Sequence, residues 1–432
     1  MKFFKFLTQL SKYFLQEYYF SFYSKSIFIF SNQISSFRLL IKSENDNIIV
    51  KFEALFSKLI GNGKSISFAA GRMGLYQILK ILKIGREDEV IVNSGNCSVV
   101  INAILSVGAK PIFSDVDLKT FGSCPNSIKE KISKSTKLII AQHSFGIPCN
   151  IDLIKNICKK NGIFLLEDCA LSLESEYQGI KLGNFGDAAL FSFDHTKPLN
   201  AFSGGIIYSK NIELIDELKK ISINSERISL KKQLLMFKRF LLEQKTLSPN
   251  KYRWIKLYNI IQSIKIKMGS LSPFLDENYN PKNNNCTYPY PAKIPSFIAQ
   301  IGIDNILYNW SKIKTLRVNN LKYIIDEFKS TPFKNSIPDI YFDTNIKIIP
   351  LRMVLVIKTA KELSGKLNLF LNYESIWFQS PIISTKGELT DFGYLNGECP
   401  KSEILGDKII NLPLDLEKKH LKILLEKIKS LL

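Results

Sequence analysis

The stretch IFLLEDCALSLESEYQGIKLGNFGDAALFSFDHTK, residues 163–197, decides the fold of this chain. Its first apolar run ends at Asp168, and a second run, ALFSF, ends shortly before Lys197. Short apolar runs bounded by glycine and polar residues are typical of buried strands. Because α/β sheets bind ligands at the carboxyl ends of their strands, we expect Asp168 and Lys197 to lie near that edge. A plain salt bridge between them is the simpler alternative.

The same alternation of apolar runs and amphipathic stretches continues on both sides of this segment. Further strand-like runs occupy residues 90–92, 111–117, 137–144 and 204–209. Helical periods occupy residues 74–84, 98–108 and 152–162. This order predicts an α/β fold with a mostly parallel central sheet and helices on both faces.

The remainder of the chain divides by composition. Residues 211–290 lose strand character and contain two basic helical stretches, 230–245 and 252–269. The last part resembles a smaller α+β unit, whose final helix is predicted to place Leu421, Leu424, Leu425, Ile428 and Leu432 along one face. The predicted domains are an N-terminal extension with a helix (1–60), a major domain (61–210), a basic helical connection (211–295) and a smaller C-terminal domain (296–432).

The first 45 residues are rich in aromatic side chains interrupted by lysines. Apolar residues could line one face of a helix, namely Phe3, Phe6, Leu7, Leu10 and Phe14. Such a helix can lie in a membrane interface, and an arm that packs on its own or a partner subunit explains the pattern equally well. The segment has no cleavable-signal pattern, and no stretch is apolar enough to span a membrane.

Charge and cysteine content narrow the class of protein. The 432 residues carry a net charge of +20, which suits anionic substrates or anionic lipid unless it reflects a general excess of lysine. No zinc-finger spacing or RNA-binding motif is present, which argues against nucleic acid. The seven cysteines have irregular spacing and form no CxxC, so we expect reduced thiols, no metal site and a cytoplasmic protein.

Several motifs, taken together and in order, resemble the DegT/DnrJ/StrS sugar aminotransferases, which have the type I fold of pyridoxal phosphate enzymes. The resemblance covers about residues 67–210 and returns at 396–430. The matching pieces are GREDEVIV at 85–92, GAKPIFSDVD at 108–117, HSFGIP at 143–148, EDCA at 167–170, GNFGDAALFSF at 183–193 and the lysine that follows. It implies that residues 61–210 form a pyridoxal phosphate-binding domain.

The resemblance assigns roles to three residues near the strand ends. Lys197 occupies the Schiff-base position, where its amine also moves the proton between substrate and cofactor. Asp168 matches the carboxylate that keeps the pyridine nitrogen protonated. Ser192 matches a hydroxyl that hydrogen-bonds the cofactor phosphate.

Further cofactor contacts are expected around these residues. The segment Gly71-Arg72-Met73 opens a helix whose N–H groups suit the phosphate. Arg72, where many relatives have Thr, either contacts the phosphate or faces solvent. Cys97 aligns with the residue that covers the cofactor ring. His143 either contacts cofactor or substrate or is a structural histidine.

The sequence also departs from the family pattern. Leu171 stands where Gln or His usually contacts the ring hydroxyl, Cys97 replaces a frequent aromatic residue, and Phe202-Ser203-Gly204-Gly205 replaces Gly-Glu-Gly-Gly. Counted from Ser192, the Schiff-base position falls on Lys197, and His195 is only an intervening residue. This register favours transamination. These departures bear on substrate choice and efficiency.

The resemblance implies a cytoplasmic homodimer that transfers an amine, with glutamate as donor, to a nucleotide-linked keto-sugar for surface polysaccharide, O-antigen or amino-sugar synthesis. Lys293 is the candidate that completes the partner's site, unless it is simply a solvated lysine. The alternative is a degenerate member with a non-catalytic role at a membrane surface or as a scaffold, contacting lipid through residues 1–45 and 230–270.

Overall fold

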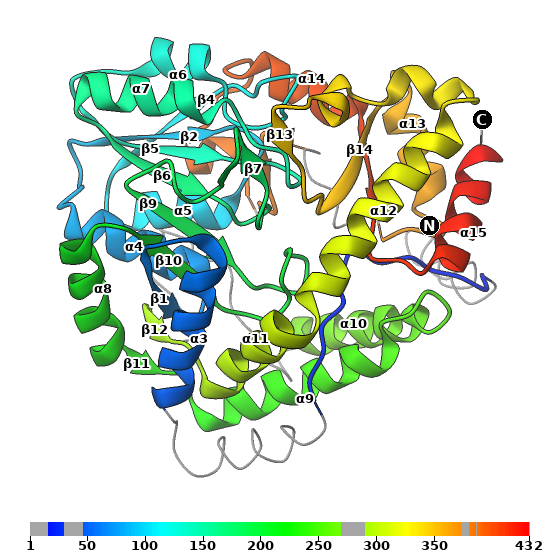
Figure 1. Ribbon diagram of the computed structural model, residues 1–432, viewed down its shortest axis with the longest axis horizontal. Helices are drawn as coiled ribbons and strands as arrows, with labels where there is room; N and C mark the ends of the chain where they lie inside the picture. The colour runs from blue at the N-terminus through cyan, green and yellow to red at the C-terminus, as the bar shows by residue number, and fades with distance from the viewer. Residues whose placement is uncertain (1–15, 30–45, 269–289, 373–379, 386, 432) are drawn as a thin grey trace.

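The computed structural model describes residues 16–29, 46–268, 290–372, 380–385 and 387–431 (Figure 1). The predicted apolar face at residues 3–14 lies outside these ranges, as does Leu432. Within the described residues, no helix is both long and apolar enough to cross a membrane.

A seven-stranded sheet forms the centre of the larger part of the molecule. Its strand order is β1-β10-β9-β6-β5-β2-β4; the strands from β9 to β4 are mutually parallel, and only β10 runs against its neighbours. The strands are β1 (Lys64–Phe68), β2 (Glu89–Asn93), β4 (Lys110–Ser114), β5 (Thr136–Gln142), β6 (Phe164–Asp168), β9 (Ala188–Ser192) and β10 (Gly205–Ser209). The predicted α/β class and mostly parallel sheet are confirmed.

Strand β1 is an element that the apolar pattern did not predict. Its sequence, KSISF, alternates serine with apolar residues, although all of it except Lys64 is buried. Glu53 accepts hydrogen bonds from the Ser67 N–H and hydroxyl at 2.8 and 2.6 Å. Ser65 bonds the hydroxyl of Ser57 at 3.0 Å. These contacts make buried serines acceptable in a strand, and a hydrophobicity pattern does not register them.

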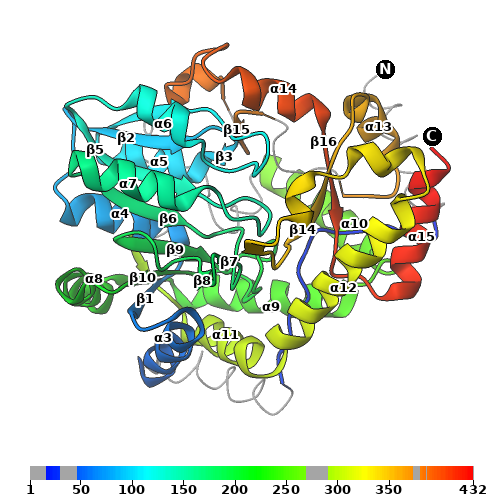
Figure 2. The same cartoon turned by 45° about the horizontal axis from the view of Figure 1, so that its top comes forward.

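Helices cover both faces of the sheet, as predicted (Figure 2). On one face α4 packs against α5 and α8, and on the other α6 packs against α7. The bounds are α4 (Gly71–Ile81), α5 (Ser98–Ser106), α6 (Pro125–Lys131), α7 (Ile151–Asn161) and α8 (Ile212–Asn224). Helix α3 (Asp46–Ile60) packs on β1 and on α11 (Ser296–Tyr308).

The C-terminal part builds a second apolar core around the antiparallel pair β14 (Arg352–Val356) and β16 (Ile409–Pro413). Helices α12 (Trp310–Phe328), α13 (Ala360–Leu367) and α15 (Lys418–Lys429) pack on this pair, and α14 (Pro400–Lys408) precedes β16. The predicted stripe of the last helix is buried at Leu421, Leu424, Leu425 and Ile428. This matches the smaller α+β unit, while the exact domain bounds stay a prediction.

Short ladders connect these parts. Asn96–Cys97 (β3) pairs with Ile382–Ile383 (β15), which brings the C-terminal half against the start of α5. The remaining two-residue strands are β7 (Glu176–Tyr177), β8 (Ile180–Lys181), β11 (Glu226–Arg227), β12 (Ala292–Lys293) and β13 (Ile346–Lys347).

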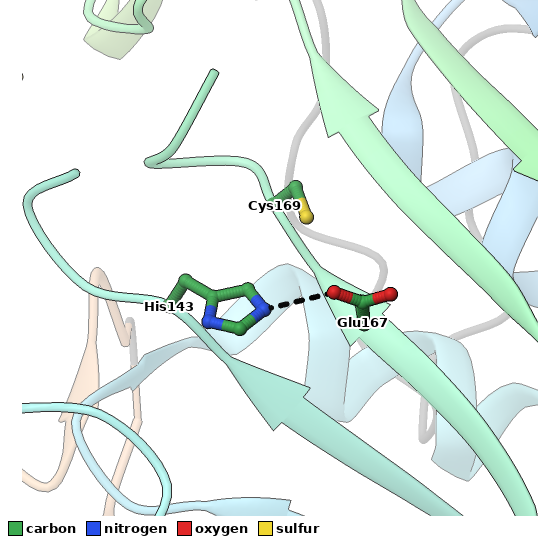
Figure 3. A group of neighbouring side chains, drawn as sticks. All are labelled: His143, Glu167 and Cys169. Atoms are coloured by element: carbon green, nitrogen blue, oxygen red, sulfur yellow. Dashed lines mark hydrogen bonds and ion pairs between the residues drawn. The ribbon is translucent and has the colours of Figure 1, made fainter. Parts of the chain in front are cut away.

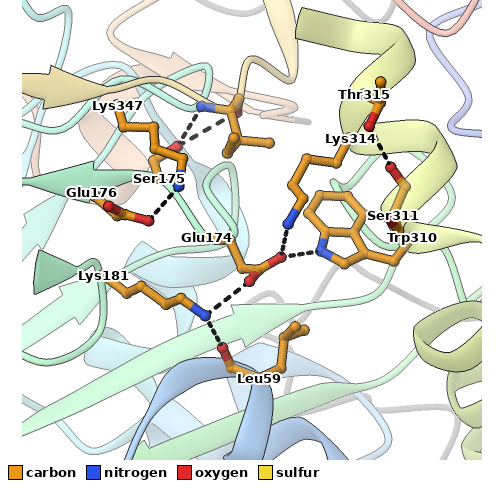
Figure 4. A network of polar contacts seen from close by, with 11 residues as sticks. Leu59, Glu174, Ser175, Glu176, Lys181, Trp310, Ser311, Lys314, Thr315 and Lys347 are labelled. Atoms are coloured by element: carbon orange, nitrogen blue, oxygen red, sulfur yellow. Dashed lines mark hydrogen bonds and ion pairs between the residues drawn. The ribbon is translucent and has the colours of Figure 1, made fainter. Parts of the chain in front are cut away.

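Glu174 joins the large unit to the start of α12 (Figure 4). Its carboxylate accepts hydrogen bonds from Trp310 Nε1 and Lys314 Nζ at 2.7 Å and from Lys181 Nζ at 2.9 Å. Burial would raise the pKa of Glu174, but the donors from Lys181, Lys314 and Trp310 outweigh it and lower that pKa. The network fixes the angle at which α12 leaves the large unit.

Residues 16–29 cross the molecule in an extended conformation, next to the hairpin of α9 (Leu230–Thr246) and α10 (Tyr252–Lys267). We call residues 16–29 the strap. Phe20 bridges to Leu371 in the smaller unit, and the Tyr19 N–H donates to the Pro249 carbonyl between α9 and α10. This part of the N-terminal segment therefore packs on its own chain, one of the two expected outcomes.

Glu167, next to Asp168 on β6, is completely buried, faces His143 (Figure 3) and organises the loop that precedes β9. One carboxylate oxygen accepts the N–H groups of Phe185 and Gly186 at 2.7 and 2.8 Å. The other accepts the Gly183 N–H at 2.8 Å and lies 3.2 Å from His143 Nε2. Successive strand residues point to opposite faces, so anchoring Glu167 behind the sheet directs Asp168 to the other side.

We predict that Glu167→Gln destabilises the protein by about 3 kcal/mol, because the new NH₂ group would face two donors, Gly183 N–H and His143 Nε2–H. Urea denaturation followed by circular dichroism measures the change. The control is Glu176→Gln, which removes a more exposed ion pair to Lys347 and should cost less than about 1 kcal/mol. Equal losses for the two variants would contradict the proposed anchor.

Candidate active site

A pocket of about 260 Å³ lies at the carboxyl edge of the parallel strands. Six of the eight predicted site residues line it: Gly71, Arg72, Cys97, Asp168, Ser192 and Lys197. They come from the start of α4, the start of α5, the end of β6, the end of β9 and the loop that follows β9. Four separate segments thus converge because parallel strands end at one edge.

Asp168 ends β6 and is 4% exposed. Its carboxylate accepts the Ala170 N–H at 3.0 Å and lies 3.4 Å from Asn96 Nδ2. Burial raises the pKa of Asp168, while the Ala170 N–H and the positive charge of Lys197 oppose that rise. A buried carboxylate of this kind gains from a cationic partner in the pocket.

Lys197 sits on a tight turn after β9. Its N–H donates to the Asp194 carbonyl at 3.0 Å, and the Asp194 carboxylate accepts the Thr196 N–H at 3.1 Å. Although burial opposes it, the charges of His195 and Lys197 lower the pKa of Asp194. The turn therefore concentrates charge beside the pocket and holds the lysine at its wall.

The N-terminus of α4 opens on the pocket through Ala70, Gly71 and Arg72. Its N-cap residue, Ala70, has no side chain that could cap the first N–H groups, so these groups suit an anion. Gly205 lets the backbone of β10 pass directly against Gly71, because a Cβ on Gly205 would collide with the Gly71 backbone.

The loop before Gly205 contains a residue in the left-handed region. Phe202 has a φ of 77°, at the position where the family pattern has glycine. Its ring is 4% exposed and packs edge-on against Phe240 of α9 at 6.0 Å. Aromatic packing thus holds a backbone conformation that costs a non-glycine residue about 1 kcal/mol.

Two predicted residues do not line the pocket. The Met73 side chain is completely buried, and its sulfur accepts the Ala292 N–H at 3.2 Å. His143 is completely buried; its Nδ1 accepts the Cys149 N–H at 3.1 Å, so the remaining proton lies on Nε2 and points to Glu167. This geometry gives His143 a structural partner on the far side of β6 from Asp168.

The structure also locates residues at which the sequence departs from the family pattern. Leu171 and His195 both line the pocket, so Leu171 presents an apolar surface where a polar side chain was the family expectation. Lys293 is buried, with its Nζ 2.9 Å from Asp46 of the same chain. Its contribution to a partner's site stays a prediction.

The structure adds wall residues that the sequence did not single out. These are Asn96, Gln142, Asp194, Thr196 and Arg352. Asp194 and Thr196 lie in the quoted stretch 163–197, between the strand run ALFSF and Lys197, so their place near the pocket can be inferred from the sequence. Arg352 begins β14, where no motif matched; it is 1% exposed, and burial together with the charge of Arg317 lowers its pKa to about 9.

The fold is that of known aminotransferases. An aminotransferase from Psychrobacter cryohalolentis superposes with a TM-score of 0.70 at 17% identity, covering 95% of this chain and 98% of that one. A putative sugar aminotransferase of Streptococcus pneumoniae, in its PMP form, gives a TM-score of 0.68 at 17% identity over 94% of this chain and 98% of that one. At these identities the similarity establishes the fold alone.

Part of the chain is similar in sequence to known sugar aminotransferases. Residues 42–235 match the model of the DegT/DnrJ/EryC1/StrS aminotransferase family. GDP-perosamine synthase of Vibrio cholerae is 30% identical over 179 residues, 41% of this chain and 49% of the relative. A dTDP-4-dehydro-2,3,6-trideoxy-D-glucose 4-aminotransferase of Saccharopolyspora spinosa is 32% identical over 173 residues, 40% of this chain and 45% of the relative. The chain thus matches less than half the length of these relatives.

We predict that a maleimide labels Cys97 roughly tenfold faster than Cys124, because Cys97 is partly exposed at the pocket wall whereas Cys124 is buried. Peptide-resolved mass spectrometry of the native protein gives both rates. Equal rates in the folded protein would mean that the pocket is closed to solutes at Cys97.

Proposed function

We propose that this protein is a pyridoxal phosphate-dependent aminotransferase that acts on a nucleotide-linked keto-sugar. The observation that carries the proposal is the convergence of Asp168, Lys197 and the open N-terminus of α4 on one pocket. The family match and the names of the relatives support it.

The pocket residues fit the proposed cofactor by their chemistry. The first N–H groups of α4, with Ser192 opposite, suit its phosphate, and the close approach of Gly205 to Gly71 keeps side chains out of this corner. Asp168, whose burial disfavours an isolated charge, suits the cationic pyridine nitrogen. When bound, pyridoxal phosphate supplies an electron-withdrawing ring that stabilises negative charge on the neighbouring substrate carbon.

The chain's own residues then divide the work. The Lys197 amine would hold the cofactor and would carry the proton between the two carbons that exchange it. Asp168 keeps the ring nitrogen protonated, and Asn96 orients the Asp168 carboxylate. Cys97 and Leu171 line the pocket and would cover the ring with apolar surface, and Arg72 would add positive charge beside the phosphate. The roles of Met73 and His143 as cofactor contacts are not supported by their positions.

Charge supports the proposed substrate class. The net charge of +20 favours a substrate with a diphosphate, and Arg352 places a buried cation in the same pocket wall, where an amino-acid donor such as glutamate would bring its carboxylate. Surface polysaccharide, O-antigen or amino-sugar synthesis is the setting we propose, and we propose a cytoplasmic homodimer as the working form. One relative is named a spore coat polysaccharide biosynthesis protein, from Bacillus subtilis.

We predict that purified protein incubated with pyridoxal phosphate acquires an absorbance band from the bound cofactor, and that borohydride reduction attaches the cofactor covalently to Lys197. Lys197→Ala should lose both the covalent adduct and turnover. Peptide mass spectrometry locates the adduct, and light scattering on the same sample gives the oligomeric state. Lys110→Ala, at an exposed lysine paired with Glu89, is the control and should behave as wild type. Trapping that persists in Lys197→Ala would contradict the assignment.

A second role, at a membrane surface, is favoured by the outer face of α9 and α10. The two helices contain nine Lys or Arg residues, and their one acidic residue, Glu243, is buried against Arg239. Large apolar side chains on this face are exposed, namely Leu230, Leu234, Leu235, Trp254, Ile261, Ile264 and Met268. Basic and apolar groups without exposed acid suit anionic lipid. This role is compatible with catalysis, and it is the one left if Lys197 traps nothing.

We predict that the protein co-sediments with phosphatidylcholine vesicles that contain phosphatidylglycerol and much less with phosphatidylcholine alone, and that added salt weakens binding. The variant W254S/I261S/I264S should lower the bound fraction several-fold, because it removes apolar area from the basic face. I212S/I404S, at exposed apolar sites elsewhere, is the matched control. Unchanged sedimentation of the triple variant would point to a protein partner or a second copy of the chain on this face.

A further inference from the structure

The strap passes directly beneath the turn that carries Lys197. The Ser24 N–H donates to the His195 carbonyl at 2.8 Å, and the Asn200 side chain donates to the Ser24 carbonyl at 2.8 Å. The Ser24 hydroxyl lies 2.6 Å from the Lys197 carbonyl oxygen. All three polar groups of one strap residue therefore bind the loop 194–200.

The direction of the hydroxyl bond is fixed by a third group. Arg317 Nη2 lies 2.8 Å from Ser24 Oγ, and a guanidinium only donates. Ser24 Oγ must therefore accept from Arg317, which leaves its own proton for the Lys197 carbonyl. Two consecutive hydrogen bonds through the Ser24 hydroxyl therefore connect Arg317 to the backbone of Lys197.

Arg317 is itself held rigidly. It is 1% exposed and forms a two-point contact with Asp415, with Nη2 at 2.9 Å from Oδ2. Asp415 follows β16 in the smaller unit, and its carboxylate also accepts the strap's Lys25 N–H at 3.2 Å. Ser24 thus connects the loop of Lys197 to an ion pair that belongs to the other core.

Side-chain packing reinforces the same contact. The Tyr23 ring lies 4.1 Å from the His195 ring, and Ser24 is 1% exposed. A buried, charge-assisted chain of this kind resists displacement because each group that moves leaves a desolvated partner behind.

We propose that Ser24 is a positioning residue for Lys197: it fixes the loop 194–200 and ties it to the Arg317–Asp415 pair, so that the lysine keeps its place at the pocket wall. This inference rests on the proposed function for the role of Lys197, but the restraint that Ser24 places on the loop 194–200 can be measured without cofactor. Small displacements of a reacting group cost large factors in rate, so a loosened loop should lower kcat more than it raises KM.

The test compares Ser24→Ala and the milder Ser24→Cys with Ser26→Ala. Ser26 lies on the same strap and is 7% exposed, but its hydroxyl accepts from Asn305 of α11 instead of binding the lysine loop. Hydrogen exchange of cofactor-free protein, read on peptides that cover residues 194–200, should be roughly tenfold faster in Ser24→Ala, less affected in Ser24→Cys and unchanged in Ser26→Ala. In the loaded protein, kcat should fall about tenfold in Ser24→Ala with KM nearly constant.

The inference is overturned if both Ser24 variants exchange this loop at the wild-type rate, or if Ser26→Ala accelerates it equally. It is also overturned if the loop loosens but kcat stays at the wild-type value. Should wild-type protein trap no cofactor on Lys197, the proposed function fails, whereas the exchange rates still decide whether Ser24 holds the loop.

Discussion

The Glu167 carboxylate, buried behind β6, accepts three backbone N–H groups of the loop 183–186 and faces His143 on its fourth side. Leaving any of these groups unpaired in the protein interior would cost more than a surface hydrogen bond is worth. The loop therefore enters β9 in one fixed way, and β9 in turn delivers Ser192 and the turn of Lys197 to the pocket. Strand alternation then leaves Asp168 only the opposite face. The buried Glu167 carboxylate thus helps to position both Asp168 and the turn that carries Lys197.

The pocket depends on contacts between parts of the chain that are far apart in sequence. Arg352 comes from the smaller unit, residues 383 and 384 arrive through the short β3–β15 ladder, and Ser24 comes from the strap. Ion pairs hold these parts in place: Glu174 pairs with Lys314 of α12, and Asp415 pairs with Arg317. Because the Arg317–Asp415 pair is buried, removal of either partner leaves an uncompensated charge, which makes this contact sensitive to single substitutions.

The departures from the family pattern acquire physical meaning in this setting. Phe202 keeps a left-handed backbone without glycine because its ring is packed against Phe240 of α9. The α9–α10 hairpin therefore supports the loop beside the pocket from within while its outer face is basic and apolar. Leu171 leaves the corresponding part of the pocket wall apolar, so any polar contact to a ligand has to come from other wall residues such as Asn96.

The sequence by itself determined the sheet class, six of the seven main strands, the basic helices and the placement of Asp168 and Lys197 at one edge, because these depend on local periodicity and on the rule that parallel strands end at one edge. Ser192 was added by the resemblance to the family. The apolar pattern did not predict strand β1, because its buried serines are satisfied by hydrogen bonds to residues outside the strand. The structure places His143 against Glu167, Met73 in the core, Arg352 in the pocket wall and Ser24 against the backbone of the Lys197 loop. Only the tertiary structure could decide these, because a side chain's partner is set by packing between segments whose distance in sequence carries no record of their distance in space.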